Sequence, residues 1–234
     1  MTQLVEKTGA RSDTDPLPVG PRRSRAAQAR SMVPLVALVL AFLLFLLPPY
    51  LGLDPSQGRI PNVTVIPARY PLLIVHIATA TIALLTLCLQ MWPWLRERHP
   101  KAHRISGRVY VFAGALPAAV LSVVLSFMAT SSHGVLGVIT AGVFWGVTTA
   151  VGFLRARQGR WSAHRRWMLY SFAFALQAVW ARLLAIGSIV LGLSPDPILM
   201  GEAGTWLGWI VNVLLVQWWL VRTARRARQP VASY

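Results

Sequence analysis

The chain has 234 residues, of which 55% are hydrophobic and only 13% are charged, and its mean hydropathy is +0.54. Soluble domains carry about 25% charged residues, so the composition excludes an ordinary soluble enzyme and predicts an integral membrane protein. The formal net charge of +16 would suit a nucleic-acid partner, but the placement of the basic residues favours a surface that attracts anionic lipid headgroups and no nucleic acid.

Residues 1–30 contain Gly, Pro, Ser, Asp and Arg without periodicity, and we expect a disordered, basic cytoplasmic tail there. Residues 31–222 should form a six-helix membrane domain, and residues 223–234 a cytoplasmic C-terminal tail. Most of the apolar stretches reach the roughly 17–25 residues that a spanning helix needs, which predicts an all-α integral membrane protein with six transmembrane helices. The stretches are Met32–Leu51, Tyr70–Pro93, Val109–Met128, Gly134–Leu154, Trp167–Leu193 and Thr205–Val221.

The basic residues are distributed very unevenly around these stretches. Twenty of the 23 Lys and Arg residues lie in the N-terminal tail, in the connections after the second and fourth stretches, and after the sixth. The positive-inside rule therefore predicts an inner-membrane protein with both termini and the two basic connections in the cytoplasm. On the other side we find only Arg59 and Arg69, and Arg182 lies within the fifth stretch.

A weak internal repeat relates the second and third stretches to the fourth and fifth. His103-Arg104 precedes the third stretch and His164-Arg165 precedes the fifth, and Tyr110 and Tyr170 follow these two pairs. The two hairpins run the same way through the membrane, so they predict parallel repeats about a pseudo-two-fold axis along the membrane normal. The second to fifth helices would then form a four-helix core, which the first and sixth flank.

Four histidines recur at intervals of 27, 30 and 31 residues: His76, His103, His133 and His164. Each interval is about one membrane crossing plus a turn, so successive histidines fall on alternate sides. This predicts that His76 lies near His133 and that His103 lies near His164. Imidazole is the commonest metal ligand and an axial ligand of haem, and His103 and His164 are the best candidates for either role.

The surroundings of the histidines leave two interpretations open. His103 and His164 each fall in the first turns of a helix, next to basic residues that suit haem propionates or an anionic substrate. Those basic residues are Arg104, Arg108, Arg165 and Arg166. The alternative is that these histidines and arginines contact lipid headgroups. His76 lies in an apolar helix and needs a partner, whereas His133 also fits a simple loop residue.

Arg182 lies well inside the fifth stretch, in Val179-Trp180-Ala181-Arg182-Leu183. A central arginine costs at least ~2.5 kcal/mol on insertion scales, so we expect it to face the bundle or a wet cavity. Its partner would be a carbonyl, water, a bound anion such as a haem propionate, or an acid such as Asp196 or Glu202. Snorkelling to the headgroups is the alternative.

Two strings carry a resemblance to a known family. They are His103-Arg104-x-x-Gly107-Arg108-x-Tyr110 and His164-Arg165-Arg166-Trp167-Met168. Together with His76 they resemble an uncharacterised family of bacterial multi-pass membrane proteins, known only as a domain of unknown function. The resemblance covers about residues 70–182 and implies no established activity.

More distantly, the layout is similar to the ascorbate-reducing dihaem cytochromes b. Those proteins have six helices and a four-helix core, and each core helix contributes one histidine. The resemblance implies an outer haem on His76 and His133 and an inner haem on His103 and His164. The histidines of that family lie deeper in the bilayer than His103, His133 and His164 do here.

The expected function is therefore a haem b-binding electron carrier or oxidoreductase in the membrane. Electrons would pass between a cytoplasmic reductant or quinone and an external acceptor, and the partners would be a quinone, a redox protein or a second copy of the chain. The alternative is a cofactor-free scaffold or partner subunit. A small-molecule transporter is the third reading, although the stretches lack the paired interruptions of a midplane substrate site.

Overall fold

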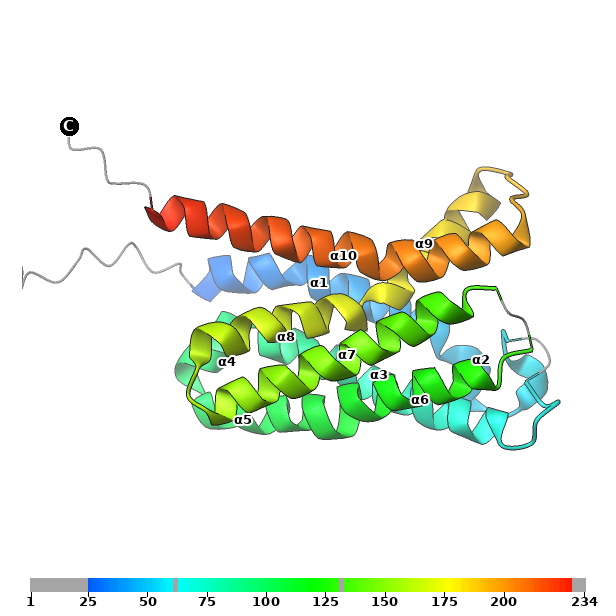
Figure 1. Cartoon of the computed structure of the whole chain (residues 1–234), viewed down its shortest axis with the longest axis horizontal. Helices are drawn as coiled ribbons and strands as arrows, with labels where there is room; N and C mark the ends of the chain where they lie inside the picture. The colour runs from blue at the N-terminus through cyan, green and yellow to red at the C-terminus, as the bar shows by residue number, and fades with distance from the viewer. Residues whose placement is uncertain (1–24, 61–62, 131–132, 229–234) are drawn as a thin grey trace, which may run out of the picture.

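The computed structural model describes residues 25–60, 63–130 and 133–228 (Figure 1). Throughout these ranges the secondary structure is helical and no strand is present, which confirms the all-α class. The longer helices are α1 (Arg25–Leu46), α3 (Arg69–Met91), α7 (Val135–Arg157), α8 (Trp161–Ala175), α9 (Gln177–Val190) and α10 (Pro197–Arg228). The shorter ones are α2 (Pro48–Leu51), η1 (Pro55–Gln57), α4 (Pro93–Arg98), α5 (Pro100–Arg108), η2 (Val109–Ala115) and α6 (Leu116–Phe127).

Six helical segments of the described chain are long and apolar enough to cross a membrane, as the sequence predicts. They are Ala26–Leu46, Arg69–Met91, Pro100–Phe127, Val135–Arg157, Trp161–Val190 and Pro197–Arg225. The third combines α5, η2 and α6, and the fifth combines α8 and α9. Helices suit this environment because each backbone N–H and C=O must find a partner inside the lipid.

The helices extend beyond the apolar stretches at both ends of the membrane domain. α1 begins at Arg25 rather than near residue 31, and α10 ends at Arg228 rather than near residue 222. The extensions consist mainly of Ala, Arg and Gln, which are good helix formers and need no lipid contact. The remainder of the predicted tails, residues 1–24 and 229–234, lies outside the described residues.

The core of the bundle consists of α3, the α5–η2–α6 segment, α7 and α8. α7 packs along α6 and α8, and α3 packs along η2 and α6. α10 lies across α7, α8 and α9, and α1 lies against α3 (Figure 1). This arrangement agrees with the predicted four-helix core and its two flanking helices.

Small residues allow the core helices to approach closely. A Cβ at Gly114 of η2 would lie 2.9 Å from both the Cα and the backbone nitrogen of Ala83 on α3. A Cβ at Gly142 of α7 would lie 2.5 Å from Ser122 Oγ on α6. In lipid, helices associate through such close packing, because no hydrophobic driving force acts between them.

Two irregularities interrupt the core helices. The backbone of η2 is π-helical over Val109–Ala115, and α8 ends at Ala175 before α9 resumes at Gln177. Pro117 has no N–H to donate to the carbonyl four residues earlier, which loosens the hydrogen bonding where η2 joins α6. Single π turns within helices are frequent at functional sites, so η2 marks a part of the bundle to inspect.

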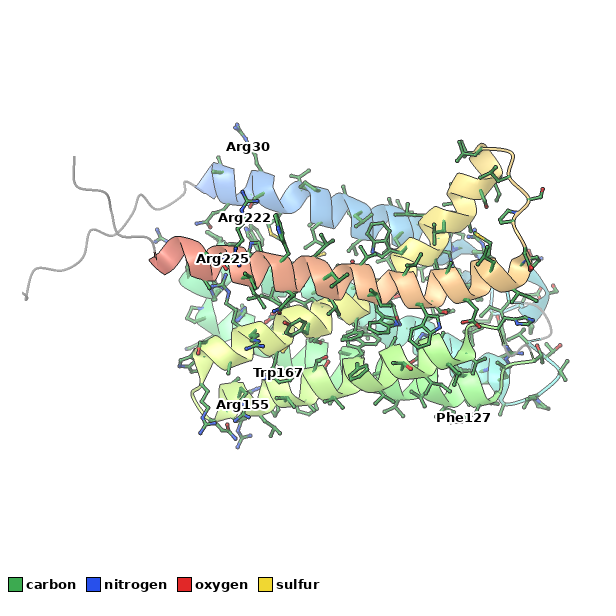
Figure 2. All side chains as sticks on the ribbon, turned by 45° about the horizontal axis from the view of Figure 1, so that its top comes forward. Arg30, Phe127, Arg155, Trp167, Arg222 and Arg225 are labelled. Atoms are coloured by element: carbon green, nitrogen blue, oxygen red, sulfur yellow. The ribbon has the colours of Figure 1, made fainter. Side chains whose placement is uncertain are left out.

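The two ends of the bundle differ in charge. The basic end carries the start of α1, the end of α10, α4 and α5, and its arginines include Arg30, Arg155, Arg222 and Arg225 (Figure 2). The opposite end carries α2, η1 and the connection between α9 and α10. This separation matches the uneven distribution of basic residues along the sequence.

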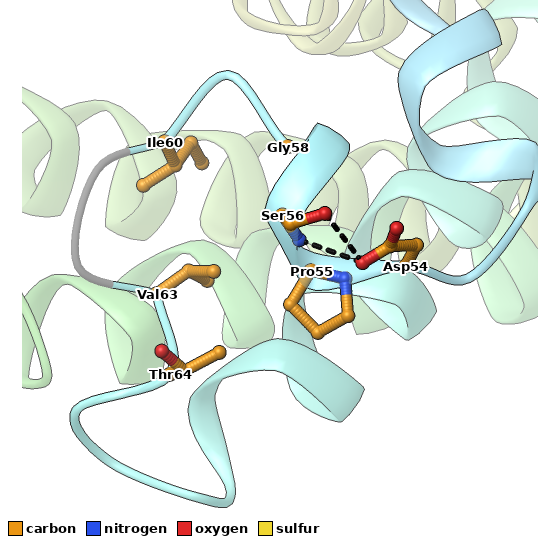
Figure 3. A pocket seen from close by; sticks show the side chains of 7 residues that line it. All are labelled: Asp54, Pro55, Ser56, Gly58, Ile60, Val63 and Thr64. Carbon is orange, nitrogen blue, oxygen red and sulfur yellow. Dashed lines mark hydrogen bonds between the residues drawn. The ribbon is translucent and has the colours of Figure 1, made fainter.

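A small loop at the opposite end covers the start of α3. The Asp54 carboxylate accepts hydrogen bonds from the Ser56 backbone N–H at 2.9 Å and from its hydroxyl at 2.8 Å (Figure 3). The backbone bond, followed by the hydroxyl bond, lowers the pKa of Asp54. Asp54 and Ser56 also line a surface cavity of about 470 Å³, together with Pro55, Gly58, Ile60, Val63 and Thr64.

Candidate functional site

The predicted inner pair, His103 and His164, lies at the basic end of the core. His103 is on α5 and His164 is in the first turn of α8, and both side chains are partly buried. The two rings are close enough for their charges to interact. The two residues that the sequence pairs, 61 positions apart, therefore lie at the same end of the bundle.

A backbone carbonyl fixes the ring of His164. Its Nδ1 lies 2.8 Å from the carbonyl oxygen of Gly152 on α7. A carbonyl only accepts, so Nδ1 must carry a proton, and in the neutral ring Nε2 is then the nitrogen that can bind a metal. A carbonyl that holds one ring nitrogen in this way is the usual means of orienting a histidine that ligates a metal through the other.

His103 has a different environment. Its Nδ1 is buried and has no hydrogen-bond partner. Its backbone carbonyl accepts a hydrogen bond from Gln90 Nε2 of α3 at 2.9 Å, and the same Nε2 donates to Ser106 Oγ at 2.7 Å. Gln90 thus holds α5 against α3, and the His103 ring retains an unsatisfied polar atom, which is costly when buried.

The protein side chains alone do not form a metal cage. Within the described ranges, no group of three or more His, Cys, Asp or Glu residues is close enough to hold a metal ion. Two histidines are nevertheless a full set of axial ligands for haem iron, because the porphyrin supplies the other four. The pair therefore suits haem better than a bare ion.

A buried polar cluster, which sequence reasoning missed, lies between the helices of the core. It consists of Tyr110 on η2, Ser171 on α8, and Thr149 and Trp145 on α7. Tyr110, Ser171 and Thr149 are fully buried. The Ser171 hydroxyl lies 2.7 Å from both the Tyr110 and Thr149 hydroxyls. Tyr110 falls seven residues after His103, and Ser171 seven after His164, so helical periodicity could have revealed it.

The proton positions in this cluster follow from counting donors. Thr149 donates to the Trp145 carbonyl at 2.7 Å and must therefore accept from Ser171. Ser171 must then accept from Tyr110, which itself accepts from Trp145 Nε1 at 3.4 Å. The hydrogen bonds therefore form a closed loop, from the Trp145 indole N–H through the three hydroxyl groups to the Trp145 carbonyl. Every N–H and O–H of these four side chains is used as a donor. The cluster thus links η2, α7 and α8, and none of its protons is available to a further partner.

We expect Tyr110→Phe to lower the free energy of unfolding by about 1 kcal/mol, within the range measured for hydrogen bonds between membrane helices. The change leaves Ser171 without its donor and Trp145 Nε1 without its acceptor. Unfolding in detergent, followed by circular dichroism, measures the effect. The matched control is Tyr170→Phe, because the Tyr170 hydroxyl donates to Gln217 on α10 outside the core. Equal losses in the two variants would contradict a special role for the cluster.

The different orientations of Tyr110 and Tyr170 also limit the internal repeat. Tyr110 is fully buried among the core helices, whereas Tyr170 contacts α10. The residue of α8 that meets Tyr110 is Ser171, one position after Tyr170. The repeat therefore describes the course of the hairpins but does not make the two tyrosines equivalent.

The predicted outer pair has two different environments. His76 Nδ1 lies 3.0 Å from the Ala118 carbonyl of α6, so this histidine also carries its proton on Nδ1. His133 is exposed before α7 and lies beside Gly201 of α10. The next residue, Gly134, donates its N–H to Glu202 at 2.7 Å. His76 thus packs against α6 and His133 against α10.

The predicted anion-binding arginines lie on the surface of the basic end. The side chains of Arg104, Arg108, Arg165 and Arg166 are all exposed. The Arg165 guanidinium lies 5.2 Å from the ring centre of Trp219 on α10, so it faces away from His103. Arg182 lies on α9, towards the opposite end of the bundle, and is partly buried.

Comparison with known proteins identifies the family. No curated protein and no solved structure matches the chain. A family model described as "Predicted membrane protein (DUF2306)" matches residues 73–220. The match begins within α3 and ends within α10, so it includes the four regularly spaced histidines and Arg182 and excludes α1. The chain therefore belongs to the DUF2306 family of predicted membrane proteins.

Proposed function

We propose that this protein binds one haem b at the basic end of the core, between His103 and His164, and carries single electrons in the membrane. The observation that supports the proposal most is the state of the two rings. Gly152 holds Nδ1 of His164, which leaves Nε2 of the neutral ring to bind a metal, and His103 has a buried ring nitrogen without a partner. Haem would supply an iron that accepts and returns one electron.

The space around His103 and His164 would accommodate a planar haem only if the side chains of Gln90 and Met168 move. A Cβ at Gly107 would lie 3.2 Å from Gln90 Oε1, and one at Gly152 would lie 2.7 Å from Met168 Sδ. At both glycines the nearest atom is the end of a flexible side chain rather than backbone. Rotation of Gln90 and Met168 would therefore widen the space beside the histidines without separating the helices.

The residues of the chain have distinct roles in this proposal. The Gly152 carbonyl would keep His164 in one tautomer. Arg104 and Arg108, one and five residues beyond His103, would reach the propionates or the headgroups at the surface. The electron donor would be a quinol or a cytoplasmic reductant, and the acceptor a second redox protein.

The proposal is limited to one haem. The resemblance to dihaem cytochromes implies a second haem on His76 and His133, but these two residues pack against different helices. His133 also lies outside the apolar part of the bundle. A haem bound there would need α7 and α10 to separate at Gly134 and Glu202, which are hydrogen-bonded.

An absorption spectrum of the purified protein, before and after dithionite, tests the proposal. Expression should be performed with ample haem, and bound haem should be quantified as the pyridine complex. We expect about one haem per chain, with the sharp reduced bands of a low-spin, bis-histidine iron. Colourless protein from haem-replete cells would overturn the proposal.

The alternative function is a cofactor-free scaffold or partner subunit. Close packing of the described core favours it, because Ala83, Ala115, Ala118 and Ala141 have no exposed surface and Gly114 meets the backbone of α3. The same spectrum separates the two functions. A folded, colourless protein that co-purifies with another membrane protein would favour the scaffold.

We also propose that the basic end faces the cytoplasm of a bacterial cell. The distribution of arginine in the described chain supports this orientation. A single cysteine at Gln158, in the Cys88→Ala background, should be blocked from outside labelling by an impermeant maleimide. A cysteine at Ser56, at the opposite end, should be labelled in intact cells. Labelling of the Gln158 position from outside would reverse the topology.

A further inference from the structure

Arg182 lies at the junction of α9 with α1 and α2. Val179, one helical turn before Arg182, is buried against Val39, Phe42 and Leu43 of α1. Residues three apart share a face of a helix, so Arg182 lies on the face of α9 that meets α1. In this region α9 leaves the four-helix core and lies along α10 (Figure 1).

A second arginine and a tyrosine lie near Arg182. Both Tyr50 of α2 and Arg59 of the following loop are close enough to act on its charge. The Arg59 backbone N–H donates to the Tyr50 hydroxyl at 3.3 Å, and its guanidinium lies 4.0 Å from the ring centre of Phe45. Arg182 and Arg59 carry like charges that act on each other at the edge of an apolar bundle, which is unfavourable without a counter-charge.

No carboxylate of the described chain neutralises Arg182. The charged or titratable groups that act on its charge are Tyr50 and Arg59, and neither is a carboxylate. Glu202, one partner that the sequence suggests, instead accepts from Gly134 and from Trp206 Nε1 at 3.0 Å. Asp196, the other, accepts from the Ile198 backbone N–H at 2.8 Å. The described protein therefore leaves this positive charge uncompensated.

We propose that Arg182, Arg59 and Tyr50 form a binding site for a phosphate group, and that the natural ligand is an anionic phospholipid headgroup. Guanidinium groups bind phosphate oxygens in pairs, and a tyrosine hydroxyl can donate a further hydrogen bond. This site is at the opposite end from His103 and His164, so it does not depend on the haem proposal.

The setting favours a lipid over free phosphate. Arg182 is eight residues from the end of α9, about 12 Å along the helix, so it lies within the span. Apolar side chains that remain exposed on the two helices of this junction suit acyl chains: Leu183, Ile186 and Ile189 on α9, and Leu44 and Phe45 on α1. A headgroup bound here would thus keep its tails in the bilayer.

The test uses the full chain in a neutral detergent. Three probes are added separately: phosphatidylglycerol, diacylglycerol with the same acyl chains, and inorganic phosphate. Native mass spectrometry counts bound lipid, and the thermal midpoint reports stabilisation. We expect phosphatidylglycerol to bind and to raise the midpoint, whereas diacylglycerol, which lacks the phosphate, should do neither. Arg182→Gln should weaken phosphatidylglycerol binding at least about tenfold.

Controls separate this site from general attraction to basic surfaces. Arg157→Gln removes an exposed arginine at the basic end and should change binding less than about twofold. Arg59→Gln should weaken binding as Arg182→Gln does. Binding of inorganic phosphate that Arg182→Gln abolishes would support the phosphate site and assign it to a free anion. Unchanged phosphatidylglycerol binding by a folded Arg182→Gln variant would overturn the proposal.

Discussion

Replacing His164 with alanine is expected to abolish the low-spin haem spectrum of the purified protein, and replacing His103 is expected to do the same. Each histidine would supply one of the two axial bonds, so neither variant can keep a six-coordinate, low-spin iron. At a fixed supply of haem, we expect bound haem to fall at least about tenfold. The reduced absorption spectrum and the pyridine assay measure this loss.

Two other histidines provide the controls. His99→Ala removes an exposed ring that packs on Trp94 with 4.5 Å between ring centres, and this variant should keep the full spectrum. His76→Ala removes the hydrogen bond to Ala118 and tests the second site directly. If His76→Ala removes half of the haem, the protein holds two. A His103→Ala variant with an unchanged spectrum would move the iron away from the basic end.

The course of the helices could be predicted from the sequence because lipid leaves the backbone few choices. Hydropathy located the six spans, and charge separated the two ends. The helix ends extended further than expected, as at Pro100 and Trp161, since polar helix formers continue a helix outside the apolar layer. The π-helical η2 and the break at Leu176 depend on how neighbouring helices fit, and no local pattern specifies that.

The candidate site was predictable only in part. The spacing of His103 and His164 predicts that they lie at the same end of the bundle, and in the structure both lie at the basic end. Their partners were not predictable, because the Gly152 carbonyl is a backbone group with no sequence signature. The cluster of Tyr110 and Ser171 was missed because the repeat directed attention to Tyr170, which contacts Gln217 instead.

The partners of Arg182 could not be predicted from the sequence either. Its cost in lipid predicted that it would avoid the bilayer centre and seek a partner, and the structure places it near Tyr50 and Arg59. Asp196 and Glu202 were reasonable partners by position along the chain. In the structure, however, Asp196 accepts a hydrogen bond from the backbone N–H of Ile198, and Glu202 accepts one from the backbone N–H of Gly134. Only the folded arrangement could show these contacts.

The second large effect is expected at the contact between α3 and η2. Gly114→Ala should lower the free energy of unfolding by about 1–3 kcal/mol, the usual cost of overpacking a filled core. The added methyl group would lie 2.9 Å from the backbone of Ala83, and backbone cannot rotate out of the way as a side chain can. Either α3 or η2 must shift, which would also disturb the buried Tyr110 hydroxyl nearby.

The sign of this effect separates packing from helix propensity. Alanine is better than glycine in a helix by about 1 kcal/mol, so propensity alone would make Gly114→Ala stabilising. Gly187→Ala on α9 is the matched control, because no atom lies within 4 Å of the added Cβ, and it should be neutral or stabilising. Unfolding titrations of both variants in the same detergent measure the difference. If both variants change stability in the same direction and by the same amount, the α3–η2 contact is not what holds the core together.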